Sequence, residues 1–260
     1  MSAFKHTTGL LLLAGLLITP AALAKRIERS FSATPGDQLV IRTQVGSIDV
    51  ETHNSDEILV DIRLEGDGED DITVRFEEGS DGLTIIGERN DDAGWWNGNW
   101  TKAEFTVTVP AQYNVDVDTA GGSISVADLT GNIDARTSGG SIRVGNVTGD
   151  VDLQTSGGSI RTDDIYGEID AHTSGGSINV TFARQPEQDA TLKTSGGTIR
   201  ARFPADVRMD LDASTSGGRV STEFDIDGNV KKRSIRGRVN GGGPEITLRT
   251  SGGSVSVDKI

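Results

Sequence analysis

The sequence predicts an all-β protein, a parallel β-solenoid with two short strands in each coil of about 18–21 residues and an irregular N-terminal β cap. A six-residue phrase, Thr-Ser-Gly-Gly-Ser-Ile or a close variant, recurs at intervals of 18, 18, 18, 21, 21 and 35 residues. A fixed period with a fixed turn signal is typical of stacked repeats. Apolar and polar residues alternate with a period of two, and no helical period follows residue 24. The copies begin at Thr119, Thr137, Thr155, Thr173, Thr194, Thr215 and Thr250.

One repeat, residues 137–154, shows how a coil is built. Ile142 and Val144 alternate with polar residues, and so do Val151 and Leu153, as in strands with one buried face. The segments between these runs are rich in Gly and Asn, which accept the positive φ angles of tight turns. Each repeat is therefore predicted to contain two short strands and two turns.

Stacked coils should place equivalent side chains above one another. Each strand would lie ~4.8 Å from its counterpart in the next coil, in a parallel ladder. The threonine of each phrase falls in step with the inward positions, so we expect its hydroxyl to bond a backbone group of the adjacent turn. The main apolar column is predicted to contain Ile124, Ile142, Ile160, Ile178, Ile199, Val220 and Val255.

Outward positions should form columns too. One of them stacks aspartates, which is unfavourable where like charges are directly opposed. We expect a nearby outward column of arginines to offset this repulsion, although each surface pair contributes little. The aspartates are Asp116, Asp134, Asp152, Asp170 and Asp212, and the arginines are Arg143, Arg161 and Arg200.

The first 24 residues have the pattern of a secretory signal peptide. Lys5 precedes a short apolar run, and an Ala-Leu-Ala ending predicts cleavage after Ala24. The run is short for a membrane span, and no transmembrane segment is expected once it is removed. The chain has no cysteine, so neither a disulfide nor a lipid-modified cysteine is expected. We predict a periplasmic or secreted protein.

Residues 25–260 are predicted to form a single elongated solenoid domain. Residues 25–112 would supply irregular N-terminal coils and a cap, in which strands at 58–64, 72–76 and 83–86 form hairpins that close the first end. Residues 113–260 would supply the regular coils, with a hairpin insertion at 223–243. The chain then returns to a last coil that ends at Ile260.

The three tryptophans of the chain, Trp95, Trp96 and Trp100, fall within one polar, glycine-rich loop. One interpretation is an apolar plug over the end of the core, because tryptophan is large and rarely left fully wet. The other is a stacking platform for a sugar or for a side chain of a partner. This loop is the main candidate for ligand or partner binding.

A basic cluster occupies the predicted hairpin insertion of an otherwise acidic chain, whose net charge is −14. A solvated hairpin is one interpretation, and docking to an acidic surface or an anionic polymer is the other. Nucleic acid is not an expected partner, because the chain is acidic, carries an export signal and lacks interleaved aromatics here. The cluster contains Lys231, Lys232, Arg233, Arg236 and Arg238.

These features together resemble the bacterial putative-adhesin, or toastrack, β-repeat family. The resemblance rests on the leader, the first Gly-Ser-Ile strand, the Val-Pro-Ala strand at 109–111, the serial phrases and the Asn-Gly-Gly-Gly-Pro-Glu-Ile run at 240–246. It covers about residues 31–260. It implies a β-solenoid in the cell envelope, in a domain of unknown function that supplies no catalytic residues. The tryptophan loop and the basic hairpin are not part of the family pattern.

The predicted function is a non-catalytic envelope protein that binds or scaffolds a protein or glycan partner, without a cofactor. The first alternative is a calcium-binding β-roll, since the acidic segments 65–71 and 77–81 offer carboxylates, although the phrase lacks an aspartate ligand. The second is a polysaccharide-active enzyme. Only His53 and His172 follow the leader, so no catalytic residue and no metal site are predicted.

Overall fold

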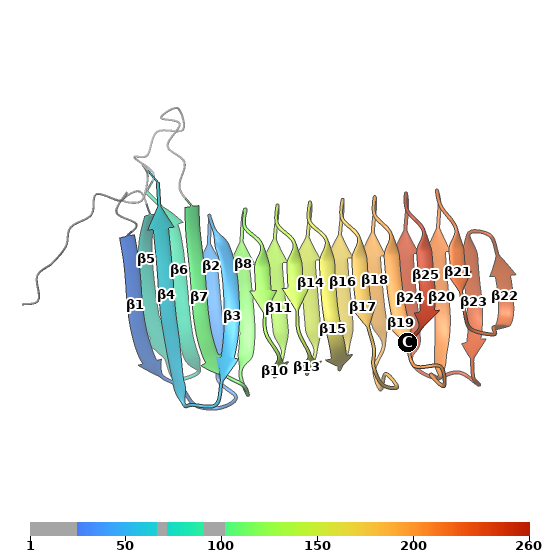
Figure 1. Cartoon of the computed structure of the whole chain (residues 1–260), viewed down its shortest axis with the longest axis horizontal. Coiled ribbons are helices and arrows are strands. Elements are labelled where there is room, and N and C mark those ends of the chain that lie inside the picture. Colours follow the sequence, from blue (N-terminus) through green and yellow to red (C-terminus); the bar gives the residue numbers. More distant parts are fainter. Residues whose placement is uncertain (1–24, 67–71, 91–101) are drawn as a thin grey trace, which may run out of the picture.

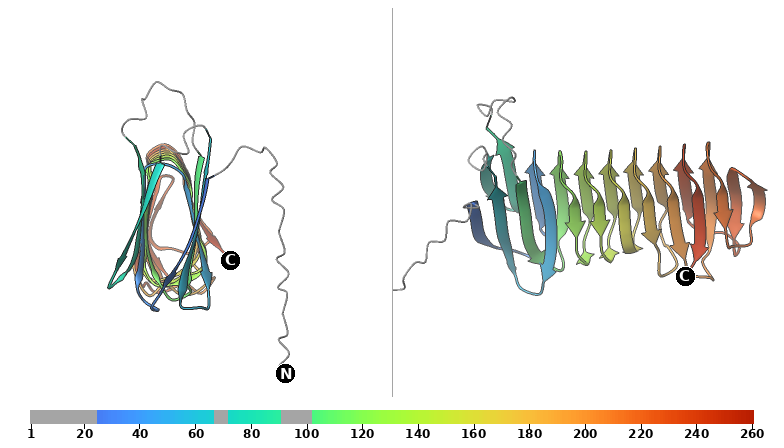
Figure 2. Two further views of the ribbon diagram at one scale, coloured as in Figure 1. Left: turned by 90° about the vertical axis from the view of Figure 1, so that its left-hand side faces the viewer. Right: turned by 45° about the horizontal axis from the view of Figure 1, so that its top comes forward.

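The structure, a computed structural model, describes residues 25–66, 72–90 and 102–260. Within these ranges the chain winds into a long rod, in which two sheets face one another along the whole length (Figures 1 and 2). The described residues include no helix that could cross a membrane. The predicted leader, the acidic residues 67–71 and the tryptophan loop lie outside the described ranges.

One sheet has thirteen strands. Its main path contains, in spatial order, β1 (Lys25–Ser32), β4 (Glu57–Glu65), β7 (Lys102–Pro110), β3 (Ser47–His53), β9 (Ile124–Val126), β12 (Ile142–Val144), β15 (Ile160–Tyr166), β17 (Ile178–Thr181), β19 (Ile199–Phe203), β25 (Val255–Lys259) and β21 (Val220–Thr222). Off this path, β13 (Val147–Thr148) pairs with β15 and with β10 (Leu129–Thr130).

The facing sheet has twelve strands. Its spatial order is β22 (Asp227–Lys231), β23 (Ser234–Val239), β20 (Met209–Thr215), β24 (Glu245–Thr250), β18 (Ala190–Thr194), β16 (Ile169–Thr173), β14 (Val151–Thr155), β11 (Ile133–Thr137), β8 (Asn114–Thr119), β2 (Gln38–Thr43), β6 (Gly82–Arg89) and β5 (Ile72–Gly79). Each regular coil therefore contributes a main strand to each sheet, which agrees with the predicted two strands per coil, and two coils add a short third strand, β10 or β13.

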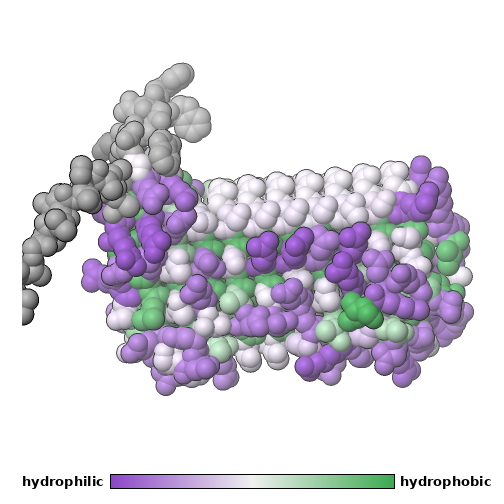
Figure 3. Space-filling model, viewed as in Figure 1, coloured by the Kyte–Doolittle hydropathy of each residue, from purple (hydrophilic) through white to green (hydrophobic). Residues whose placement is uncertain are grey.

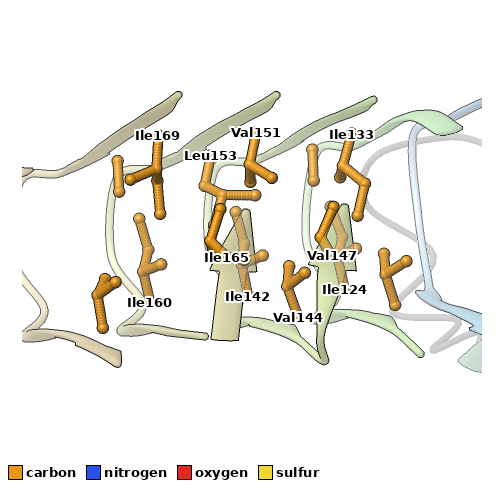
Figure 4. Packing of buried hydrophobic residues seen from close by; sticks show 14 of the residues in the cluster. Ile124, Ile133, Ile142, Val144, Val147, Val151, Leu153, Ile160, Ile165 and Ile169 are labelled. Carbon is orange, nitrogen blue, oxygen red and sulfur yellow. The ribbon is translucent and has the colours of Figure 1, made fainter. Parts of the chain in front are cut away.

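The apolar columns are in register. Ile142 pairs with Ile124 on one side and with Ile160 on the other, and Ile160 pairs in turn with Ile178. The facing sheet stacks its own column, and both columns point into the space between the sheets (Figure 4). The predicted parallel β-solenoid with a narrow apolar interior is confirmed.

The threonine of each phrase closes the corner between the two sheets. The Thr137 hydroxyl donates to the carbonyl of Gly122 one coil earlier (2.8 Å), and the Thr155 hydroxyl does the same to Gly140 (2.7 Å). The second glycine of the phrase is obligatory, because a Cβ on Gly158 would lie 1.9 Å from the carbonyl oxygen of Gly140. The inward threonine with a backbone partner is confirmed.

The opposite corner uses side-chain amides and carboxylates. The backbone N–H of Asn132 donates to Oδ1 of Asn114 (2.9 Å), and the N–H of Asp150 donates to Oδ1 of Asn132 (3.0 Å). The N–H of Glu168 continues the series to Oδ1 of Asp150 (3.0 Å). These bonds satisfy backbone donors that the turns would otherwise leave unpaired.

The N-terminal end is closed by antiparallel strands, as the sequence predicts. β6 and β7 stack in parallel on β2 and β3 as an additional coil, and β4 and β5 then pair antiparallel with β7 and β6. β1 pairs antiparallel with β4 at the edge of the thirteen-stranded sheet. The rings of Phe31 on β1 and Phe76 on β5 are 5.6 Å apart, so the outermost strands meet across the open end of the core.

The coil that ends at Ile260 is present as β24 and β25, but it is not the outermost coil of the rod. Strands β24 and β25 lie between the coil of β18 and β19 and the coil of β20 and β21 (Figure 1). The end is instead covered by the β22–β23 hairpin, whose Lys232 carbonyl accepts the N–H of Val220 (3.0 Å). The two coils carry equivalent inward side chains, so either of them could stack on the coil of β18 and β19. The repeat pattern therefore does not determine which coil is outermost.

Candidate functional site

The tryptophan loop lies outside the described residues, so binding through Trp95, Trp96 and Trp100 stays a prediction. The strands that flank the loop are described: β6 ends at Arg89 and β7 begins at Lys102. The N–H of Gln44, in the first corner of the rod, donates to the carbonyl of Gly87 (3.1 Å). The end of β6, which precedes the tryptophan loop, therefore lies beside the first corner of the edge along which the glycine-rich phrases stack.

That edge is a ridge of small residues. The Ser-Gly-Gly-Ser segments of successive coils stack along one side of the rod, where they form a pale, near-neutral band in Figure 3. Backbone N–H groups here are partly satisfied by neighbouring serines, as where the N–H of Ser159 donates to Oγ of Ser141 (3.1 Å). Apart from the exposed Arg219 in the phrase that begins at Thr215, the described phrases of the ridge carry small, uncharged residues, so the ridge separates the two charged faces of the rod.

The basic hairpin divides into two parts. On β23, the Arg236 guanidinium pairs with Asp212 of β20 (2.7 Å) and the Arg238 guanidinium pairs with Asp227 of β22 (2.6 Å). These two arginines are therefore neutralised locally, and Arg236 holds the hairpin against β20 of the outermost coil.

Lys231, Lys232 and Arg233 lie at the turn between β22 and β23, and all three are exposed. None of the three forms an ion pair with another described residue. Of the five basic residues that the sequence suggests for docking, these three are the ones available to a partner.

The aspartate column lies on the outer face of the twelve-stranded sheet. Asp116, Asp134, Asp152 and Asp170 are aligned in register along four successive strands, next to a groove of about 550 Å³. Burial raises the pKa of Asp134, and the nearby Arg136 guanidinium opposes this shift without cancelling it. The ionised form of this carboxylate is thus disfavoured in the fold.

The expectation that Arg143, Arg161 and Arg200 offset the aspartates is wrong. These arginines lie on β12, β15 and β19 of the thirteen-stranded sheet, whereas the aspartates lie on the other sheet. The chain turns the corner at Ser-Gly-Gly, so outward residues before and after the phrase face opposite sides of the rod. On the aspartate face itself, Arg42 pairs with Asp116 and Arg136 pairs with Asp134 and Asp152.

The two histidines are at the surface. His172 lies in a column between Gln154 and Lys193, as predicted, and contacts Asp170 of its own strand. Nε2 of His53 is 2.7 Å from the carbonyl oxygen of Glu57. Across residues 25–66, 72–90 and 102–260, no group of three or more histidines, aspartates or glutamates is arranged to hold a metal ion.

Comparisons with solved structures give distant matches. A putative cell adhesion protein from Clostridium sporogenes is 10% identical, with a TM-score of 0.44 over 91% of this chain and 100% of that chain. A putative adhesin from Bacteroides fragilis is 14% identical, with a TM-score of 0.35 over 91% and 97% of the two chains. A putative lipid binding protein from Parabacteroides distasonis is 13% identical, with a TM-score of 0.28 over 90% and 96%. Likenesses this distant carry no argument about function.

Among curated proteins, none matches this chain. A family model described as Toastrack DUF4097 matches residues 37–168 and, in a second copy, residues 140–258. The two matches overlap and together extend over nearly all of the coils described above. The resemblance seen in the sequence is thereby confirmed, and the chain belongs to the Toastrack DUF4097 family.

Proposed function

We propose that this protein is a non-catalytic binding or scaffold module of the cell envelope, with a protein or a glycan as its partner. The observation that supports this proposal is the in-register stacking of coils, since it repeats each outward side chain at ~4.8 Å intervals on two flat faces. A rigid rod with such ladders offers an extended docking surface, as the faces of other solenoids do.

The proposed location is the periplasm or the exterior of the cell, after cleavage behind Ala24. This part of the proposal is supported by the basic start, short apolar run and Ala-Leu-Ala ending of residues 1–24. The lack of cysteine is compatible with an oxidising compartment, because the fold needs no disulfide there.

Two places on the chain are proposed as contacts with the partner. The first is the loop with Trp95 and Trp96, whose described flank lies at one end of the glycine-rich edge. The second is the exposed turn with Lys231, Lys232 and Arg233 at the other end of the rod. Aromatic and arginine side chains are the types that dominate binding energy at interfaces.

Cosedimentation of the purified protein with cell-wall sacculi and with envelope polysaccharide tests this function. We expect retention that falls in Trp95→Ala/Trp96→Ala without a fall in Tm. Tyr166→Ala, which removes a half-buried aromatic on β15, is the matched control and should bind normally. Retention by no envelope fraction would contradict the proposal, as would release of reducing ends from the polysaccharide. A fall in Tm with unchanged retention would identify the loop as a plug.

A melting scan with and without millimolar Ca²⁺ separates this function from that of a calcium-binding roll. We expect no change in Tm, because no metal-binding group is present among the described residues. A rise of several degrees would favour the calcium alternative, since a ligand that binds only the folded state stabilises it by mass action.

A further inference from the structure

The outer face of the thirteen-stranded sheet carries a line of arginines. Arg143 on β12 pairs in register with Arg161 on β15. Two strands further along the rod, β19 presents Arg200 and Arg202 on the same face. All four side chains are exposed, and they lie on the face opposite to the aspartate column.

A hollow lies between these arginines because the strand in the middle carries short side chains. Asn179 on β17 is the register partner of both Arg161 and Arg200, and Thr181 is the partner of Arg202. Arg161 thus flanks one side of the hollow and the two β19 arginines flank the other, with strands ~9.6 Å apart at two strand spacings. The hollow has a volume of about 290 Å³, and Asp163 is the one carboxylate among the residues that line it.

The guanidinium groups here are poorly compensated. Arg161 and Arg202 form no ion pair with any described residue, whereas Arg200 pairs with Asp258 (3.5 Å), which is also the register partner of Arg202. By contrast, the arginines on the aspartate face are paired with carboxylates, as Arg136 is with Asp152 (3.2 Å). Like charges aligned on neighbouring strands repel one another, so this face stores a cost that a bound anion would relieve.

The hollow continues along the rod. A second hollow of about 380 Å³ adjoins the same face, and Arg161 lines both of them. Arg143, the serines Ser125 and Ser141 and one carboxylate, Asp49, also line the second hollow. The combined surface crosses the strands rather than following one of them, and it presents guanidinium, amide and hydroxyl donors. A linear ligand with repeated anionic groups matches this shape and charge.

We propose that this face binds an anionic polysaccharide that lies along the rod, with a sulfate, phosphate or carboxylate group seated between Arg161 and the two β19 arginines. The guanidinium groups donate to the oxygens of the anion, which is the geometry that arginine favours. The volume is well above the ~30 Å³ share of one water, so the charged group enters together with part of its sugar. This inference rests on the proposed binding function and names its partner.

The negative charge of the rest of the chain does not prevent such binding at physiological salt. The Debye length is ~8 Å at 0.15 M, so exposed charges on the opposite sheet are largely screened from a ligand on this face. The contacts within the hollow are also ionic, so binding of the polyanion should weaken as the salt concentration rises further.

The test measures the affinity of the purified protein for dextran sulfate and for polygalacturonate, with neutral dextran as the control polymer. The triple variant Arg161→Gln/Arg200→Gln/Arg202→Gln removes the anion contacts. The matched variant Arg136→Gln/Lys193→Gln/Arg249→Gln removes the same number of positive charges from the opposite, twelve-stranded sheet. We expect about a tenfold loss of affinity in the first variant and less than about a threefold loss in the second, since the first removes three ionic contacts to the anion and the second removes none. Both variants should keep the wild-type Tm within a few degrees.

Three results would overturn this inference. The first is an equal or larger loss of affinity in the opposite-sheet variant, which would show that binding follows total charge and not the arginine hollow, while a binding function would remain intact. The second is binding of neutral dextran as tight as that of the polyanions, or no binding of either polyanion at low salt. In that case the proposed function is judged separately, by retention of the protein on envelope fractions. The third is self-association of the wild-type protein in sedimentation velocity that the arginine variant abolishes. The arginine face would then bind the aspartate face of a second copy and not a polysaccharide.

Discussion

Substitution of the second glycine in a phrase tests the packing of the corners. A Cβ on Gly158 would lie 1.9 Å from the Gly140 carbonyl oxygen, whereas Cβ atoms essentially never come within 3.0 Å of such an atom, so the coils must part by about 1 Å. The hydrogen bonds that cross this boundary include three donated by the phrase of Gly158: Thr155 hydroxyl to Gly140 carbonyl (2.7 Å), Gly157 N–H to Ser138 carbonyl (3.0 Å), and Ser159 N–H to Ser141 Oγ (3.1 Å).

At ~1 kcal/mol for each hydrogen bond lost, Gly158→Ala should destabilise the fold by about 3 kcal/mol. For a domain of this size, that loss corresponds to a fall in Tm of roughly 6–12 °C. The neighbouring Gly157 is the control, because a Cβ there meets its nearest atom at 3.2 Å and needs a shift of only a few tenths of an ångström. Thermal melting followed by circular dichroism measures both variants. If their Tm values agree within about 2 °C, the corner packing described here is wrong.

Three further predictions concern other parts of the rod. The Tyr113 hydroxyl is fully buried without a hydrogen-bond partner among the described residues, and burial raises its pKa to about 12; Tyr113→Phe should therefore stabilise the protein by about 1 kcal/mol in urea unfolding, and a loss of stability would reveal an unseen partner. The fold raises the pKa of Asp134 above its ordinary value of 3.8, so ionisation of this carboxyl lowers the stability as pH rises through the folded pKa. Asp134→Asn should therefore raise Tm at pH 7 and leave Tm unchanged well below the ordinary pKa. An equal change in Tm at both pH values would contradict this. Because Gly252 N–H donates to the Ser195 carbonyl (2.8 Å), the last coil lies next to β18; oxidation should cross-link Ser195→Cys with Ser251→Cys in preference to Ser195→Cys with Ser216→Cys, whereas the reverse preference would restore the order of the sequence.

Much of the fold could be predicted from the sequence because equivalent residues stack on one another in the same way from coil to coil. The interval of 18 or 21 residues places isoleucines such as Ile142 and Ile160 over one another, and the Gly-Gly pair permits the close corner that brings them there. The inward threonines follow from the same alternation. Each of these features depends on residues within one coil and on its identical neighbours.

The order of the C-terminal coils could not be predicted for the same reason. Val255 and Val220 are interchangeable members of one column, so either of their coils fits against Ile199. The choice depends on the long hairpin segment, which covers the outer coil and allows the chain to return. Short-range sequence patterns do not predict this return of the chain to the inner position.

The arginine face does not follow from the outward columns alone, because the alternation of residues does not say to which sheet each column belongs. Arg161 and Asp152 are close in sequence but separated by the corner, and so they face opposite sides of the rod. The signal was present: residues before the phrase belong to one sheet and residues after it to the other. The short Asn179 between two arginines would then have indicated the hollow.

Both the scaffold function and the polyanion site require outward side chains to be aligned along one face of the rod. Paired nitroxide spin labels test this alignment, and the chain has no cysteine to interfere. Labels at Arg143→Cys and Arg161→Cys, on strands ~4.8 Å apart, should show strong dipolar broadening. Labels at Arg143→Cys and Asp152→Cys, on opposite faces, should show little. Weak broadening in the first pair, comparable with that in the second, would contradict the account.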